Sequence, residues 1–245
     1  MKKSVRLGLF VINKKILIVS LAVAAATAVA AVCFTPARAS STPYSRVTVV
    51  IDAGHGGIDG GVTGVNTGVA ESELNLAVAK LLQRDFSAAG FKVVMTRTTS
   101  AGLYGKASAT LKKTDMQNRR RIIEGASPDL VISVHMNRCP LPSRRGAQVF
   151  YKPGDEASAS FADDIQSELN GMKEAVRDCF TLAGDYYVLN VSGCPAVLVE
   201  CGFLSNGDDE KLLINEEYRE KLAYAIFKGA VKYLCFNGKY PAAGG

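Results

Sequence analysis

The chain of 245 residues contains only two histidines, His55 and His135. Each closes an apolar, strand-like run, VTVVIDAGHGG for the first and DLVISVHMN for the second. A helix-like segment, GVAESELNLAVAKLL, begins near Glu71, and a third apolar run, PAVLVECGFLSN, contains Glu200. The scarce imidazoles and these two carboxylates therefore gather at the ends of predicted elements.

Acidic residues are missing from the first 39 positions, which hold six of the 29 Lys and Arg residues. The rest of the chain carries 23 basic and 23 acidic side chains, so the net charge of +6 belongs to this leader. The usual inference from a basic protein to nucleic acid therefore loses its support. We expect no nucleic acid partner.

The leader has the features of an export signal. An apolar stretch from Ile16 to Phe34 is followed by Ala37-Arg38-Ala39, which fits the small-x-small rule for signal peptidase. The stretch is nineteen residues long, close to the minimum for a bilayer span, so an uncleaved anchor is the alternative. We expect export across the cytoplasmic membrane, with residues 1–39 as a signal peptide or N-terminal membrane anchor. A short linker (40–46) and a flexible tail (237–245) would flank the main domain (47–236).

Closely spaced CxxC pairs are also absent, which argues against a zinc knuckle or a redox motif. An odd number of cysteines follows the leader, so they cannot all pair within one chain. One or two disulfides and buried free thiols are both compatible with this count. Cys201 is expected to be a packed strand residue, because no third histidine could activate it if the first two bind metal. The five are Cys139, Cys179, Cys194, Cys201 and Cys235.

Short β-branched runs alternate with helical patterns along the chain after the leader. This alternation predicts a single α/β domain with a twisted, largely parallel central sheet and helices on both faces. The strand-like runs are residues 47–51, 92–96, 130–134, 148–151, 186–189 and 196–200, and the predicted helices are residues 71–89, 116–125, 157–170 and 216–234.

Sites in sheets of this kind gather at the carboxyl ends of the strands. His55, His135 and Glu200 each follow a predicted strand, and Glu71 opens a helix after a glycine-rich loop that can fold over the sheet edge. Two imidazoles and one carboxylate form a familiar catalytic zinc set, which leaves the fourth position to water. A further carboxylate can carry the proton of that water, a role that suits Glu200.

Taken singly, each residue also has an ordinary explanation. His55 could be a turn residue, and His135 could be a core histidine bonded to a carbonyl. Glu71 could interact with the helix dipole, whereas Glu200, after an apolar run, would be costly to bury unpaired. The compact HExxH signature is absent. The glycine-rich stretch lacks GxxxxGK[ST], which argues against a phosphate loop.

Four ordered motifs, IDAGHGGIDGG, GVAESELNL, DLVISVHMN and VLVECGFLSN, resemble those of the zinc-dependent N-acetylmuramoyl-L-alanine amidases of the Amidase_3 type. The resemblance runs from about Val47 to Leu234. It implies that His55, Glu71 and His135 bind one catalytic Zn²⁺ and that Glu200 is the catalytic carboxylate. The bond cleaved would be the amide between the lactyl group of N-acetylmuramic acid and L-alanine of the stem peptide.

Finer features are similar to the germination-specific, spore-cortex amidases. The chain has a leader and a bare catalytic domain, with no long inserted helix of the autoinhibitory kind. This similarity implies a role in muramic lactam formation in the cell wall or the forespore intermembrane space, with an accessory sporulation protein as a partner. Ser72 and Ala53 depart from the family pattern, which commonly has lysine and proline there.

The expected substrates are peptidoglycan glycan strands and stem peptides, which require an open groove. Asn137 and Arg97 are candidates for substrate contacts, although Asn137 could instead form a turn and Arg97 a structural ion pair. Two alternatives use a similar ligand set. One is another zinc hydrolase of the wall, a peptidase or a deacetylase, and the other is a non-catalytic zinc-bearing wall-binding regulator.

Overall fold

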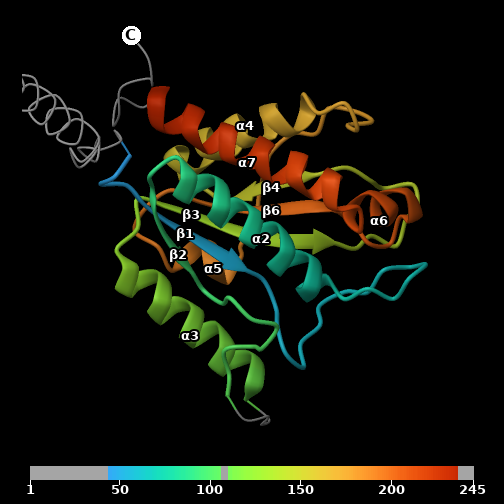
Figure 1. Cartoon of the computed structure of the whole chain (residues 1–245), viewed down its shortest axis with the longest axis horizontal. Coiled ribbons are helices and arrows are strands. Elements are labelled where there is room, and N and C mark those ends of the chain that lie inside the picture. The colour runs from blue at the N-terminus through green and yellow to red at the C-terminus, as the bar shows by residue number, and fades with distance from the viewer. Residues whose placement is uncertain (1–43, 106–109, 237–245) are drawn as a thin grey trace, which may run out of the picture. The chain divides into compact units, whose positions relative to one another are not determined.

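A computed structural model describes residues 44–105 and 110–236 (Figure 1). The predicted leader, residues 40–43 of the predicted linker and the predicted tail lie outside the described residues. Within the described ranges, none of the helices combines the length and the apolar character that a membrane span requires.

The described part of the chain contains a six-stranded sheet with the order β2-β1-β3-β6-β4-β5. All neighbouring strands are parallel except β4, which runs antiparallel to β6. The strands are β1 (Thr48–Ala53), β2 (Lys92–Met95), β3 (Leu130–Asn137), β4 (Gln148–Tyr151), β5 (Leu182–Ala183) and β6 (Ala196–Phe203). The helices are α2 (Glu71–Ala88), α3 (Leu111–Ala126), α4 (Glu156–Asn170), α5 (Tyr187–Asn190), α6 (Gly207–Leu213) and α7 (Glu216–Phe236).

Alternate side chains of the central strands enter two separate cores, as expected for a sheet covered on both faces. Val49 and Ile51 of β1 belong to the larger core, which is closed by α2, α4 and α7. Val50, between them, belongs to the smaller core under α3 and α5. Figure 1 shows these two helix layers on opposite sides of the sheet. The predicted α/β fold with a largely parallel sheet is confirmed.

The strand-like run at residues 186–189 is helical instead, because α5 begins at Tyr187. The place beside β4 is taken by β5, which the sequence analysis missed. Val188 and Leu189 are buried in the smaller core. A run of four apolar residues satisfies either a strand or a helical turn, so its period alone did not decide the structure.

Two central strands extend further than predicted, and this affects the site. β3 continues through His135 to Asn137, and β6 continues through Glu200 to Phe203. His135 and Glu200 are register partners in this parallel pair, followed by a register shift before Asn137. Both side chains are therefore held by the sheet itself instead of by loops.

Helices α4 and α7 approach each other closely at Gly229. A Cβ atom at this position would lie 2.5 Å from the Ile165 Cα atom and 2.9 Å from the Asp164 carbonyl oxygen. Because these are backbone atoms of a packed helix, they cannot rotate away. The contact explains a glycine in the interior of α7, where alanine would otherwise be favoured.

We predict that Gly229→Ala lowers the free energy of unfolding by about 1–3 kcal/mol, as overpacking does elsewhere. The matched control is Gly125→Ala in α3, where a Cβ atom would meet nothing within 4 Å. That variant should gain about 0.5–1 kcal/mol from helix propensity. Urea unfolding of both variants measures the difference, and equal effects of the same sign would contradict the packing argument.

Candidate active site

The first site residue lies just beyond β1, where the chain makes a tight turn. His55 has a φ of 57°, a left-handed conformation that is uncommon for a residue with a side chain. Its Nδ1 atom lies 2.8 Å from Asp59 Oδ2, and its Nε2 atom lies 3.3 Å from Glu71 Oε1. Asp59 therefore fixes the ring so that the other nitrogen faces the carboxylate.

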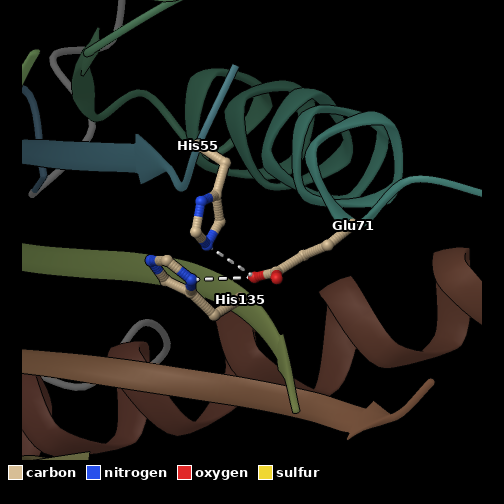
Figure 2. A group of neighbouring side chains, drawn as sticks. All are labelled: His55, Glu71 and His135. Atoms are coloured by element: carbon tan, nitrogen blue, oxygen red, sulfur yellow. Dashed lines mark hydrogen bonds and ion pairs between the residues drawn. The ribbon is translucent and has the colours of Figure 1, made fainter. Parts of the chain in front are cut away.

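Glu71 is the first residue of α2, and its side chain is only 3% exposed. The Oε2 atom accepts a hydrogen bond from the Val62 amide, and Oε1 accepts one from the Met136 amide. His135 Nδ1 lies 2.9 Å from the same Oε1 atom. Figure 2 shows both imidazole rings directed at one carboxylate oxygen.

Burial opposes ionisation of Glu71, yet hydrogen bonds and charge from His135 and His55 hold the pKa of this carboxyl far below its usual range. Burial likewise opposes a charged His55 ring, but Glu71 and Asp59 raise the pKa of His55 to about 9. The ionised carboxylates thus favour a positive charge between these side chains.

Glu200 has the opposite electrostatic character. Burial raises its pKa to about 7, His135 and His55 oppose this rise, and the negative charge of Glu71 adds to it. Its Oε2 atom is buried without a hydrogen-bond partner among the described residues. A carboxyl group with this pKa can both accept and release a proton near neutral pH.

A cavity of about 400 Å³ is lined by both histidines, Glu71 and Glu200. Asn137 also lines this cavity, and its Oδ1 atom accepts a hydrogen bond from the Arg138 amide at 2.7 Å. Arg97 is not among the lining residues. It is 3% exposed, and its donors bind backbone carbonyls, so a structural role fits it better than substrate contact.

Sequence reasoning missed several residues that support the site. Asn75 follows Glu71 by four positions on α2, so helical spacing could have found it. Asp59 follows His55 by four positions in a turn, where that spacing carries no such signal. Arg119 and Asp52 come from distant segments and meet beneath the site at 2.6 Å. No sequence pattern indicated that pair.

The three residues predicted as ligands can hold a metal ion. One ligand atom from each of His55, Glu71 and His135 lies within 4.8 Å of the other two. Ligand atoms at about 2.1 Å from a tetrahedral ion are about 3.4 Å apart, close to the separation of 3.3 Å between His55 Nε2 and Glu71 Oε1. Two imidazole nitrogens and one carboxylate oxygen are suitable ligands for a divalent cation, and the ionised carboxylates favour a positive charge between them. Three protein ligands would leave one coordination position of that cation open.

Comparison with known proteins identifies the family. Residues 49–232 match the family model of N-acetylmuramoyl-L-alanine amidase. The chain belongs to this amidase family. The protein is therefore an enzyme that acts on peptidoglycan. The bond that it hydrolyses joins N-acetylmuramic acid to L-alanine.

Three relatives illustrate the similarity. The germination-specific N-acetylmuramoyl-L-alanine amidase of Bacillus subtilis is 33% identical over 205 residues, which cover 82% of this chain and 85% of that protein. The CwlD amidase from Clostridioides difficile, solved in complex with the GerS lipoprotein, is 34% identical with a TM-score of 0.75, covering 78% of this chain and 99% of that one. An N-acetylmuramoyl-L-alanine amidase from Clostridium difficile 630 is 31% identical with a TM-score of 0.70, and the match covers 78% of this chain and 98% of that chain. The similarity to the germination-specific group expected from the motifs is thus confirmed.

No disulfide joins any two of the described cysteines, which favours the interpretation as free thiols. Cys201 is buried in β6, and burial raises the pKa of its thiol far above the usual range, with Glu200 adding to the effect. It is a packed strand residue, as expected.

The buried Asp52 beneath the site predicts acid sensitivity. Burial would raise its pKa, but Arg119 and the hydroxyls of Ser133 and Thr96 lower it from 3.8 to about 2. The folded-state pKa is the lower one, so this stabilisation is complete above pH 3.8 and is lost as the pH falls towards 2. We expect a loss of about 2 kcal/mol over that interval.

Urea unfolding of the metal-free protein between pH 5 and pH 2 measures this contribution, with Asp52→Asn as the control. The variant should be less stable at neutral pH, and its difference from the unsubstituted protein should shrink as the pH falls. A difference that stays constant across the interval would contradict the assignment to Asp52.

Proposed function

We propose that this amidase is zinc-dependent and that its ligands are His55, Glu71 and His135. The observation that carries the proposal is the convergence of two imidazole nitrogens on one buried, ionised carboxylate oxygen. Neutral nitrogen and carboxylate ligands in a set of three are typical of catalytic zinc. When bound there, zinc would lower the pKa of a water molecule to around 7 and polarise the scissile carbonyl.

Glu200 is the proton carrier in this proposal. It accepts the proton of the attacking water and donates it to the departing nitrogen of L-alanine, which leaves a free lactyl carboxylate on the sugar. The support is its position opposite His135 in the β3–β6 pair and its pKa near neutrality. Asn137 lines the same cavity and is proposed to contact the substrate.

His55→Ala, His135→Ala and Glu200→Gln separate metal binding from proton transfer. The histidine variants should lose both zinc and activity, whereas Glu200→Gln should keep zinc and lose roughly 10²–10⁴-fold in rate. Zinc content is measured by mass spectrometry of the protein, and activity by release of stem peptides with a free L-alanine amine from purified peptidoglycan. Chelator treatment of the unsubstituted protein is the control. Full zinc in both histidine variants, or full rate in Glu200→Gln, would disprove these roles.

We further propose that the amidase acts in spore cortex maturation, where removal of stem peptides precedes muramic lactam formation. The 33% identity to the germination-specific amidase of Bacillus subtilis supports this role. The role implies export, with action in the forespore intermembrane space or the cell wall. The solved complex of the similar CwlD amidase with the GerS lipoprotein supports an accessory lipoprotein as a partner here.

Expression in a Bacillus subtilis strain that lacks its germination-specific amidase tests the cortex role. We expect muramic lactam to return to the purified cortex, since the two chains are 33% identical over 205 residues, and Glu200→Gln should not restore it. Cortex digestion and mass spectrometry measure the lactam. A chain that digests vegetative peptidoglycan but leaves the cortex without lactam would contradict this role and leave the amidase activity intact.

A further inference from the structure

The turn that carries His55 has three consecutive backbone carbonyls, and each is bound by a buried side chain. Arg97 donates from Nε to the Ala53 carbonyl at 2.9 Å and from Nη2 to the Gly54 carbonyl at 2.8 Å. Arg119 donates from Nη2 to the His55 carbonyl at 2.5 Å. Buried carbonyls need hydrogen-bond partners, and in this turn two arginine side chains supply them at three consecutive residues.

This turn needs support because its backbone is strained. His55 has a φ of 57°, and the left-handed region costs a residue with a side chain about 1–2 kcal/mol. Such a conformation persists only where the surroundings hold it in place. Here it aims Nε2 of the ring at Glu71, so the strain is linked to the direction of a predicted ligand.

Arg97 itself is an unusual residue for a core. It is 3% exposed, and no carboxylate of the described residues lies within ion-pair distance of it. Its four hydrogen bonds all go to backbone carbonyls, including those of Thr99 and Ser72. Burial, with the neighbouring charge of Arg119, lowers the pKa of Arg97 to about 10. An unpaired buried cation is costly, which favours a role beyond packing.

The carbonyls that Arg97 binds belong to segments that carry two of the ligands. Nη2 joins the Gly54 carbonyl, just before His55, to the Ser72 carbonyl, just after Glu71, with both distances at 2.8 Å. One guanidinium group therefore sets the distance between the turn after β1 and the first turn of α2. The guanidinium group of arginine holds its N–H donors in one rigid plane, which suits this task. The ammonium group of lysine does not reproduce that geometry.

Gly54 connects the same arrangement to the third ligand. Asn75 donates from Nδ2 to the Gly54 carbonyl at 3.1 Å and to Glu71 Oε1 at 3.2 Å. A Cβ atom at position 54 would lie 2.3 Å from Cε1 of His135, so the His135 ring packs directly against this glycine. A shift of the Gly54 peptide would thus disturb all three ligands.

We propose that Arg97 is a positioning residue for the metal site, which fixes the backbone at Gly54 and Ser72 so that His55 and Glu71 meet at one ion. It acts through the backbone and does not touch the substrate, which agrees with its absence from the cavity lining. The inference rests on the proposed metal site, and the experiment below distinguishes failure of one from failure of the other.

The test compares Arg97→Met and Arg97→Lys with a control, Arg219→Met. Arg219 also donates to a backbone carbonyl, that of Leu213 at 2.8 Å, but it lies outside the cavity lining. Zinc affinity is measured on the folded, metal-free proteins by competition with a chromophoric chelator, and ligand geometry by the absorption spectrum of bound Co²⁺. Thermal unfolding without metal records the purely structural cost.

Arg97→Met should bind zinc about 10–100-fold more weakly and alter the Co²⁺ spectrum, as loss of residues that orient metal ligands does. Arg97→Lys should lose less affinity, and Arg219→Met should lose thermal stability without losing affinity. If Arg97→Met does not fold, a weaker affinity of Arg97→Lys supports the proposal, and an unchanged affinity and spectrum overturn it. A folded Arg97→Met with the affinity of the unsubstituted protein also overturns it. Failure of the unsubstituted protein to bind zinc would instead overturn the metal site itself and this inference with it.

Discussion

The burial of the Glu71 carboxylate between two imidazoles is the constraint on which the rest of the site depends. A carboxylate that is only 3% exposed is stable only if hydrogen bonds and positive charge surround it. Two backbone amides supply hydrogen bonds, and both imidazoles face one of its oxygens. The fold must therefore bring the end of β1, the start of α2 and the interior of β3 to one point. The parallel order of β1 and β3 does this, because both strands end at the same edge.

Buried charges of both signs lie next to the predicted ligands. The carboxylate at the cavity lies above a turn that is bound by Arg97 and Arg119, and Arg119 in turn pairs with the buried Asp52 at 2.6 Å. Asp52 is further bound by the Ser133 hydroxyl at 2.7 Å. Arg119 and Asp52 compensate each other, so the removal of either one leaves a buried charge uncompensated.

The sequence was sufficient for the longer strands and the four long helices, but not for β5, α5 or α6. Strand-like runs followed by histidine, and a helix opened by glutamate, indicated which side chains share one edge of the sheet, because parallel strands impose that edge on any sequence. The role of Arg97 was not accessible, since its partners are backbone carbonyls, which every residue has. The pairing of Arg119 with Asp52 joins positions 67 residues apart and has no local signal. The strand predicted at residues 186–189 was wrong for a different reason, because a short apolar run fits both the strand period and the helix period.

Among the carboxylates that line the cavity, Glu71 and Glu200 have pKa values that move in opposite directions, and this difference separates their roles. Glu71 receives two backbone amides and two imidazoles, so its pKa falls and it stays an anion, as a metal ligand must. Glu200 has one buried oxygen without a partner in the described residues, and burial raises its pKa to about 7. Two carboxylates whose surroundings separate their pKa values in this way are suited to different chemical tasks. An exchange of the two roles would require Glu200 to gain amide donors such as those that Val62, in the loop before α2, and Met136, near the end of β3, provide to Glu71.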